Sequence, residues 1–288
     1  MKNFFSILGK ITWLIFSLVA VISLFNFITW VHPAFNIFKT DQEILRNEEY
    51  DPSLLTINSM DKLDLYVESL CEKDKDANKI SEKALYPEIL TEIVRKRFYH
   101  NYYTYGPGDN FIAWGISKII HRSWDEVWVA DDILKSPYAQ CGQQSLVIME
   151  LLMRKGYPVR KIFLKSQKHG LEHFVLEAYY EGSWHMFDPD FEPNLALIKS
   201  LKRPSVEQIA KDTGMIASLY NSRASLMTGL TQSINYGKIN EKMPGMAYLF
   251  QNTTKIFSRF YWLLLITVYL LLNIRSYLVF SFTFISSH

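Results

Sequence analysis

Cys141, His173 and Asp188 are the residues of this chain whose types and order could do covalent chemistry. A thiol attacks a carbonyl carbon as its thiolate, and an imidazole produces the thiolate by taking the thiol proton. A carboxylate beside that imidazole fixes its tautomer and stabilises its charged form. The chain therefore has the parts of a thiol nucleophile, provided that the elements carrying them pack together.

The stretch AQCGQQSLVIMELLMRKG, residues 139–156, predicts a helix that starts at Cys141. Pro137 disfavours helical geometry in the residue before it, and Gly156 is a natural helix stop. Apolar side chains between these limits cover nearly the whole circumference, which indicates a helix buried on most sides. A helix start stabilises a thiolate, but a free cysteine is also a common filler of core gaps. The helix alone leaves both interpretations of Cys141 open.

The stretches after this helix predict three consecutive strands, of which the second carries the histidine and the third leads to the aspartate. Residues 157–165 resemble a first strand, and residues 171–180 alternate with His173 on one face. Glu181-Gly182 predicts a hairpin turn, after which SWHMF returns toward Asp188. A helix start with a thiol is thus followed by strands with an imidazole and a carboxylate, which favours the catalytic interpretation of Cys141.

These stretches resemble the transglutaminase-like superfamily of papain-fold enzymes. That family has a Gly-x-Cys helix start, a Gly-x-x-x-Arg strand start, a His-aromatic-x-x-Glu strand and a Gly-x-Trp-x-x-x-Asp-Pro hairpin. The matching stretches are AQCGQ at 139–143, GYPVR at 156–160, HFVLE at 173–177 and GSWHMFDP at 182–189. Ala139 stands where the family usually has glycine, and the resemblance covers about residues 131–191.

The resemblance implies an α+β fold with a papain-like, transglutaminase-like core. In such a core the helix that carries the cysteine packs on an antiparallel sheet that carries the histidine and the aspartate. Around this core we expect flanking helices, with a transmembrane helix at each end of the chain. By position, Cys141 is the expected nucleophile, His173 the base and Asp188 the orienting carboxylate.

No counterpart of the family's oxyanion-hole side chain is evident in the sequence. The backbone N–H of Cys141 is one expected donor to an oxyanion. Tyr105, Trp114 and Gln140 are the candidates for a second donor or for the wall of a cleft. Clustered tyrosines beside the Gly-Pro-Gly loop at 106–108 are equally typical of a packed domain edge.

A metal site is the rival interpretation of the same region, because His169 and His173 are four residues apart and His185 is near. On a helix this spacing would bring both imidazoles to one zinc ion. Gly170 and the alternation of the following residues favour a turn and a strand, where the same spacing separates them by about 13 Å. We therefore expect no metal and no other cofactor, with His169 and His185 as polar surface residues.

Two apolar segments predict membrane anchoring at both ends of the chain. Residues 11–31 are 21 in a row without a charge, and about 20 apolar residues span a bilayer core. This run is longer than the core of a cleaved signal peptide and lacks a good cleavage site, so it predicts an uncleaved signal anchor. Residues 256–284 predict a second membrane segment of open register around Arg275.

The charges around the first span predict its orientation. Lys2 and Lys10 precede it, and the following residues 32–39 carry one lysine. The positive-inside bias then places the N-terminus in the cytoplasm. Two spans put both termini on one side, so we expect residues 32–255 outside the cytoplasm.

Composition excludes one class of partner and leaves the organisation of the chain to the motifs. Lys and Arg number 31 against 29 Asp and Glu, a net charge of +2, so no field points to nucleic acid. The expected parts are a signal anchor at 1–31, a helical region at 32–130, the catalytic core at 131–200, a helical and loop region at 201–255 and the second membrane segment at 256–284.

The sequence as a whole predicts a membrane-anchored cysteine enzyme that transfers an acyl group through a thioester on Cys141. Its substrate would be a protein, a peptide or another amide or ester, and its other partner the lipid bilayer. Hydrolase, peptidase and transglutaminase-type chemistry share this machinery, and a fold does not choose among them. The alternative is a non-catalytic, membrane-anchored binding or scaffold protein with the same fold.

Overall fold

A computed structural model describes residues 2–36, 49–74, 81–166, 170–191, 193–242 and 245–285. The chain forms two compact units. One, here the helical-hairpin unit, combines Met1–Asp41, Thr104–Glu126 and Met246–His288. The other, here the sheet unit, combines Gln42–Tyr103 and Val127–Gly245. Each unit therefore joins segments that are distant in the sequence, whereas the parts expected from the sequence are consecutive.

The sheet unit consists of helices around one small sheet. Its elements, with η marking short 3-10 helices, are η2 (Pro52–Thr56), α2 (Met60–Asp74), α3 (Glu82–Arg97), α5 (Ala130–Ile133), α6 (Cys141–Arg154), β1 (Val159–Ser166), β2 (Leu171–Tyr180), β3 (Ser183–Phe187), α7 (Leu195–Ser200), α8 (Val206–Lys211), α9 (Thr213–Tyr220), η4 (Asn221–Arg223), α10 (Ala224–Leu230) and β4 (Ile234–Tyr236).

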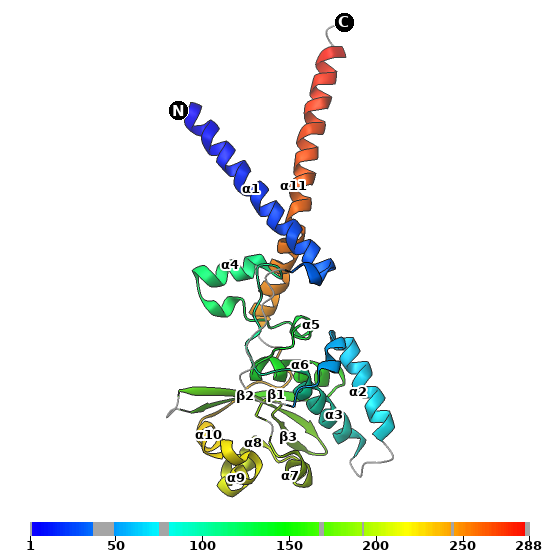
Figure 1. Cartoon of the computed structure of the whole chain (residues 1–288), viewed down its shortest axis with the longest axis vertical. Helices are drawn as coiled ribbons and strands as arrows, with labels where there is room; N and C mark the ends of the chain where they lie inside the picture. Colours follow the sequence, from blue (N-terminus) through cyan, green and yellow to red (C-terminus); the bar gives the residue numbers. More distant parts are fainter. Residues whose placement is uncertain are drawn as a thin grey trace. The chain divides into compact units, whose positions relative to one another are not determined.

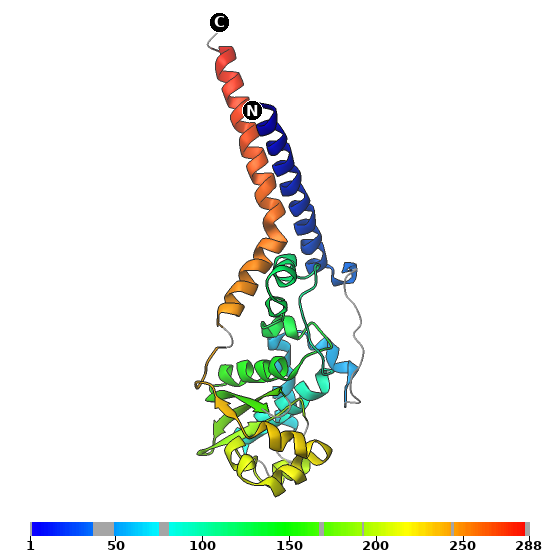
Figure 2. The ribbon, with the colours of Figure 1, turned by 90° about the vertical axis from the view of Figure 1, so that its left-hand side faces the viewer.

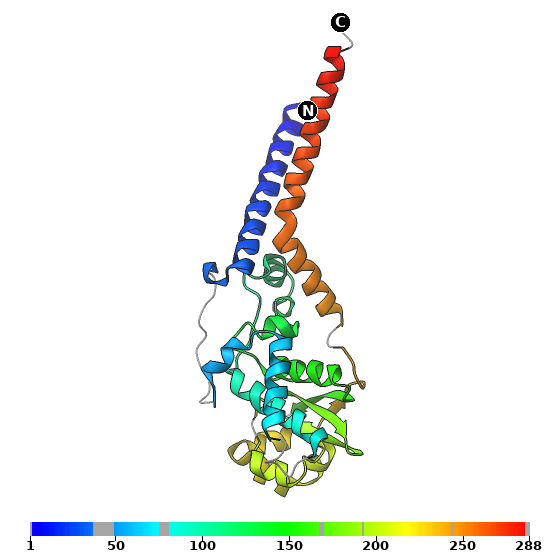
Figure 3. The ribbon, with the colours of Figure 1, turned by 90° about the vertical axis from the view of Figure 1, so that its right-hand side faces the viewer.

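The sheet has the order β3-β2-β1-β4, and all its neighbouring strands are antiparallel. Helix α6 covers one face, and α7 to α10 cover the other (Figures 1, 2 and 3). The second face contributes Ile162, Val175 and Met186 to a core shared with α7 to α10. The central strand β2 is consequently buried on both faces along most of its length. The mixed helical and antiparallel architecture expected from the sequence is confirmed.

Helix α6 begins and ends where its sequence predicts. The side chain of Gln143 accepts a hydrogen bond from the backbone N–H of Gln140, the N-cap residue, at 3.2 Å. At the other end Gly156 has a φ of 82° and donates to the Met153 carbonyl, while Tyr157 donates to the Leu152 carbonyl. These two bonds form a Schellman motif, in which glycine takes the left-handed conformation without strain.

The hairpin between β2 and β3 is also as expected. Glu181 and Gly182 both have positive φ, 50° and 80°. This is the type I′ geometry that matches the twist of two paired strands. Strand β1 starts at Val159 rather than at residue 157, because Gly156 and Tyr157 complete the cap of α6.

Helix α3 has a proline in its interior. It begins at Glu82, with the Ser81 side chain accepting a hydrogen bond from the Ala84 N–H. Pro87 therefore lies inside the helix and not in its first turn. The helix starts at Glu82 because the Ser81 side chain caps it.

The helical-hairpin unit contains α1 (Lys2–Val31), η1 (Pro33–Phe35), α4 (Phe111–Ile119), η3 (Arg122–Trp124) and α11 (Gly245–Ile285). Two of these helices are long and apolar enough to cross a membrane, over Gly9–Val31 and Gly245–Leu271. The second helix starts at Gly245, so it includes residues 245–255, which are expected from the sequence to belong to the preceding helical and loop region.

Helices α1 and α11 contact each other through aromatic rings and one hydrogen bond. The Phe27 ring packs edge-on against Phe260 and Trp262, with centroids 5.9 and 5.7 Å away. The backbone N–H of Trp262 donates to the Ser23 hydroxyl at 3.3 Å. The start of α1 and the end of α11 lie at the same end of this pair of helices (Figure 1).

Candidate active site

Cys141 is the first residue of α6, and a buried glutamine organises the backbone around it. The Gln143 amide donates to the carbonyls of Tyr103 and Val127 at 2.8 and 2.9 Å. Its oxygen accepts from the N–H groups of Tyr103 and Gln140. One side chain with no exposed surface thus ties the helix start to two separate chain segments. The Cys141 side chain itself is half-buried.

The register of the sheet explains why His173 and Asp188 meet. Leu176 pairs with Phe187 across β2 and β3. Continuing the antiparallel pairing by one step sets position 188 opposite Val175, and His173 is the next residue on the same face of β2. Such diagonal neighbours lie within reach of one another. The ring Nε2 of His173 is 3.0 Å from Asp188 Oδ2, and both side chains are fully buried.

Four groups surround the Asp188 carboxylate. Its Oδ1 accepts from the backbone N–H groups of Asp190 and Phe191 at 3.3 and 3.0 Å. Its Oδ2 accepts from the Tyr220 hydroxyl at 3.1 Å as well as facing His173. Burial and the neighbouring Asp188 charge raise the pKa of Tyr220 well above its usual value, so this hydroxyl stays protonated. A carboxylate held by several donors keeps one position.

Two contacts control the state of the His173 imidazole. Burial by itself would lower the pKa of His173, but the charge and hydrogen bond of Asp188, with a smaller contribution from Cys141, raise the pKa well above 6.5. The ring also stacks on Phe191, with centroids 3.8 Å apart and planes 8° from parallel. The imidazole is therefore held in one orientation, and its protonated form is favoured.

A second carboxylate, Asp190, lies on the other side of the ring. Its Oδ2 is 3.8 Å from His173 Nδ1, the ring nitrogen that does not face Asp188. Its Oδ1 forms a close ion pair with Nδ1 of His100. The imidazole thus lies between two carboxylates, one at each ring nitrogen.

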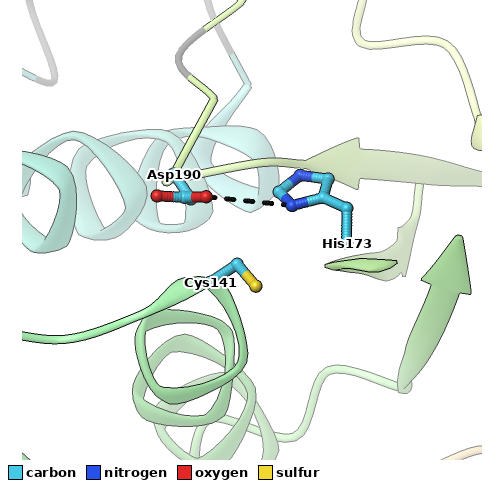
Figure 4. Close-up of side chains that lie close together, drawn as sticks. All are labelled: Cys141, His173 and Asp190. Carbon is cyan, nitrogen blue, oxygen red and sulfur yellow. Dashed lines mark ion pairs between the residues drawn. The ribbon is translucent and has the colours of Figure 1, made fainter. Parts of the chain in front are cut away.

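Cys141 completes the cluster from the α6 side. Its Sγ, a ring nitrogen of His173 and a carboxylate oxygen of Asp190 all lie within 4.8 Å of one another. Figure 4 shows Cys141, at the start of α6, on one side of the His173 imidazole, with Asp190 nearby. The three residues singled out in the sequence are therefore brought together, and Asp188 faces the histidine nitrogen opposite the one near Asp190. A thiol, an imidazole and an orienting carboxylate in this arrangement can carry out nucleophilic attack on a carbonyl.

The three oxyanion candidates stay predictions. Gln140 is the N-cap residue of α6, directly beside Cys141 in the chain, and is half-buried. Tyr105 and Trp114 belong to the helical-hairpin unit. Tyr105 is buried there, with its N–H donating to the Asp125 carbonyl at 2.7 Å, while Trp114 is partly exposed on α4.

The expectation for His185 is wrong, because this residue is buried and not a surface residue. Its Nδ1 lies 2.9 to 3.0 Å from the carbonyls of Lys202 and Arg203. Its Nε2 lies 3.1 Å from the Tyr180 carbonyl, and its ring stacks on Tyr180. Strand β3 directs this side chain into the core, where it lies beside the backbone carbonyls of Lys202 and Arg203. Sequence periodicity does not show that this part of the chain packs there. His169 lies outside the described residues.

Four residues of the site were not identified from the sequence. Asp190 follows Asp188 closely in Asp-Pro-Asp, a local signal for a second carboxylate that could have been used. Phe191 directly follows Asp190 in the same turn. Tyr220 and His100 carry no such signal, because they reach the site from distant parts of the chain.

Two other motif residues support the sheet instead of the reaction. Arg160 and Glu177 are direct cross-strand partners on β1 and β2, and their side chains pair at 2.6 Å. The Arg160 guanidinium also lies between the rings of Trp184 and Tyr236, 4.2 and 4.4 Å from their centroids. The second oxygen of Glu177 accepts the Val206 N–H at the start of α8 at 2.7 Å.

The fold and site together define a cysteine, histidine and aspartate centre on a helix packed against an antiparallel sheet. No protein-family model matches the chain, and none of the curated proteins compared with it matches either. Among solved structures, one described as the crystal structure of a TGase matches with a TM-score of 0.30 and 15% identity. The match covers 56% of this chain, which spans about a third of that protein's length (36%).

Proposed function

We propose that the protein is a membrane-anchored, cysteine-dependent acyl-transfer enzyme. The observation that carries this proposal is the approach of Cys141, at a helix start, to a buried imidazole that is itself bonded to Asp188. The helix dipole and a protonated His173 both stabilise the thiolate of Cys141. The thiolate attacks an amide or ester carbonyl, His173 protonates the leaving group, and a thioester forms.

The second half-reaction uses the same residues in the opposite direction. His173 takes a proton from water or an amine, which attacks the thioester and frees Cys141. Water gives a hydrolase or peptidase, and an amine gives a transferase of the transglutaminase type. The backbone N–H of Cys141 lies in the first turn of α6, where helix amides lack intrahelical acceptors, and it would donate to the oxyanion. Gln140, directly beside Cys141 in the chain, is the candidate for a second donor within the same unit.

Membrane anchoring is the other part of the proposal. The helices over Gly9–Val31 and Gly245–Leu271 have mean hydropathies of 2.3 and 1.3. The rest of the protein buries few of their residues, 11% in the first helix and 17% in the second. A lipid bilayer would cover the remaining apolar surface.

Acylation by p-nitrophenyl acetate tests the catalytic proposal without knowledge of the natural substrate. The full chain in detergent should release a burst of p-nitrophenolate and carry an acetyl group on Cys141, identified by mass spectrometry of peptides. Cys71→Ser should keep the burst, and Cys141→Ser should lose it. A non-catalytic scaffold protein would acetylate both cysteines slowly and at similar rates, which would reject the enzyme.

A second candidate function is favoured by the composition of the same cluster. Cysteine sulfur, histidine nitrogen and aspartate oxygen are all zinc ligands. Zinc bonds of 2.0 to 2.3 Å require neighbouring ligand atoms roughly 3.3 to 3.8 Å apart, and His173 Nδ1 and Asp190 Oδ2 are 3.8 Å apart. Asp188 and His100 would act as the outer partners that orient such ligands.

Metal analysis separates the two candidates. A zinc centre predicts one equivalent of metal in the purified full chain and a Cys141 thiol that reacts only after chelation. The thiol enzyme predicts rapid acetylation of Cys141 in the presence of a chelator and no gain in rate from chelation.

A further inference from the structure

Helix α4 and the turn η3 carry apolar side chains that the described part of the helical-hairpin unit leaves uncovered. We call residues 111–124 the α4 segment. Ile119 and Ile120 are 86% and 66% exposed, and the indole rings of Trp114 and Trp124 are also exposed. Four such side chains within eleven positions form more than the scattered exposure that is normal on a soluble surface.

The start of the α4 segment is tied to α1 near the end of its apolar stretch. The Asn26 amide donates to the Pro107 carbonyl at 2.8 Å, and its oxygen accepts the Phe111 N–H at 3.4 Å. The Thr29 hydroxyl donates to the Gly108 carbonyl. Asn26 and Thr29 are buried among these partners, so the loop before α4 is fixed to the side of α1.

Helix α11 holds the same point from its other side. The Ser258 hydroxyl donates to Asn110 Oδ1 at 3.0 Å and accepts the Ile112 N–H at 3.3 Å. The Asn110 amide donates to the Thr254 hydroxyl at 2.9 Å. The α4 segment is therefore attached to both long helices by hydrogen bonds of buried polar groups.

This attachment determines the depth of the segment once the long helices span a membrane. Gly9–Val31 contains 23 residues, and at 1.5 Å per residue its length is about 34 Å, slightly more than a hydrocarbon core of about 30 Å. Thr29 is within one turn of the end of this stretch. Thr254 and Ser258 of α11 lie at the start of the membrane segment 256–284 expected from the sequence, and α11 continues as a helix to Ile285. The α4 segment thus starts at the boundary between hydrocarbon and headgroups, the depth where tryptophan is enriched.

We propose that the α4 segment lies in the interfacial layer of the bilayer, with Ile119, Ile120 and the two indole rings in contact with lipid. The occupant of this surface is lipid because the apolar side chains of α1 and α11 beside the attachment points, Ile28 and Ile256, are exposed as well. The Lys118 ammonium lies over the Trp114 ring at 5.8 Å and within 3.6 Å of Asp125. A lysine stem of this kind can pack along apolar surface and keep its charge at the headgroups. The proposal rests on the membrane anchoring proposed above.

A fluorescent label that reports lipid contact tests this surface in the full chain. NBD is attached to a single cysteine in the Cys71→Ser, Cys141→Ser background, reconstituted in liposomes that contain doxyl-labelled lipids. Ile119→Cys reports the α4 segment. Val21→Cys, 64% exposed in the middle of the α1 span, reports the bilayer core, and Leu65→Cys, 68% exposed on α2, reports a similarly exposed apolar position on the sheet unit.

The expected result is a blue-shifted Ile119→Cys signal, quenched most by doxyl groups near the headgroups. Val21→Cys should be quenched most by doxyl groups deep in the acyl chains, and Leu65→Cys by neither. Quenching at Val21→Cys with none at Ile119→Cys overturns the interfacial segment and leaves the spans intact. A blue-shifted but unquenched Ile119→Cys means that protein, such as a second copy, covers the surface, which also overturns it. No quenching at Val21→Cys rejects the membrane anchoring itself.

Discussion

The imidazole of His173 lies between two carboxylates, and this position determines the reactivity expected of each residue in the site. Asp188 bonds to Nε2 and is held by Tyr220 and two backbone N–H groups. Asp190 lies near Nδ1 and is paired with His100. The first carboxylate is arranged as a fixed orienting group. The second is close enough to the thiol for both to bind one metal ion.

Alkylation should distinguish the two cysteines of the chain. Both are half-buried, so exposure is not the difference. At mildly acidic pH, iodoacetamide should modify Cys141 at least about tenfold faster than Cys71, because a helix start and an imidazolium stabilise its thiolate. His173→Ala should slow the reaction of Cys141 without changing Cys71, as measured by mass spectrometry of the labelled peptides. Equal rates that His173→Ala leaves unchanged would mean that Cys141 is a core thiol.

Asp188→Asn should reduce turnover much more than stability. The amide no longer stabilises an imidazolium, so we expect acylation by p-nitrophenyl acetate to fall by roughly 10²-fold or more. Asp190→Asn, which alters the more distant carboxylate, should have the smaller effect on the same rate. Thermal unfolding of both variants checks that the fold persists. A larger loss in Asp190→Asn would transfer the orienting role to Asp190.

The raised pKa of His173 links stability to pH. The folded protein holds this proton more tightly than the unfolded chain, whose histidines titrate near 6.5. The resulting stabilisation is fully present below about pH 6.5 and is lost as the pH rises through the higher folded pKa. The thermal midpoint of the full chain in detergent should fall over that range, and His173→Gln should flatten the dependence. Parallel curves for both proteins would contradict this linkage.

Strands β1 and β2 determine the placement of the site through their pairing. The same strand pair carries one buried and one exposed cross-strand ion pair. Arg160 faces Glu177, which has no exposed surface, whereas Lys165 faces Glu172 with both side chains about half exposed. Glu177 additionally binds the first N–H of α8. These contacts join β1, β2 and α8 into one rigid support for His173.

Removing the buried acid should therefore cost far more than removing the exposed one. Glu177→Ala leaves Arg160 without its carboxylate and should lower the free energy of unfolding by about 3 kcal/mol. Glu172→Ala, the matched control on the same strand, should change it by less than about 1 kcal/mol. Denaturant unfolding monitored by circular dichroism measures both. Similar losses in the two variants would show that the motif residues are not structural.

The whole molecule combines a site on one unit with two long apolar helices on the other, and its orientation in a membrane is a separate question. Lys2 and Lys10 precede the first span, so we predict that residues 32–255 lie outside the cytoplasm. Reporter fusions after residue 50 measure this orientation. An alkaline phosphatase fusion, which works only outside the cytoplasm, should be active, and a fluorescent protein that works only in the cytoplasm should not fluoresce. Activity of the cytoplasmic reporter alone would reverse the orientation.

Local patterns were enough to predict the helix that starts at Cys141, the hairpin at Glu181-Gly182 and the two long apolar helices. Each of these depends on hydrogen bonds or apolar spacing within a few residues. They also predict the order of thiol, imidazole and carboxylate along the chain.

Tertiary packing alone decided which groups surround His173. Tyr220 and His100 reach the site from separate elements, and no short-range pattern records such contacts. Packing also buried His185, and it grouped residues 104–126 with the terminal helices. The physical reason is that periodicity shows which face of an element is buried, whereas the partner of that face depends on how distant elements pack.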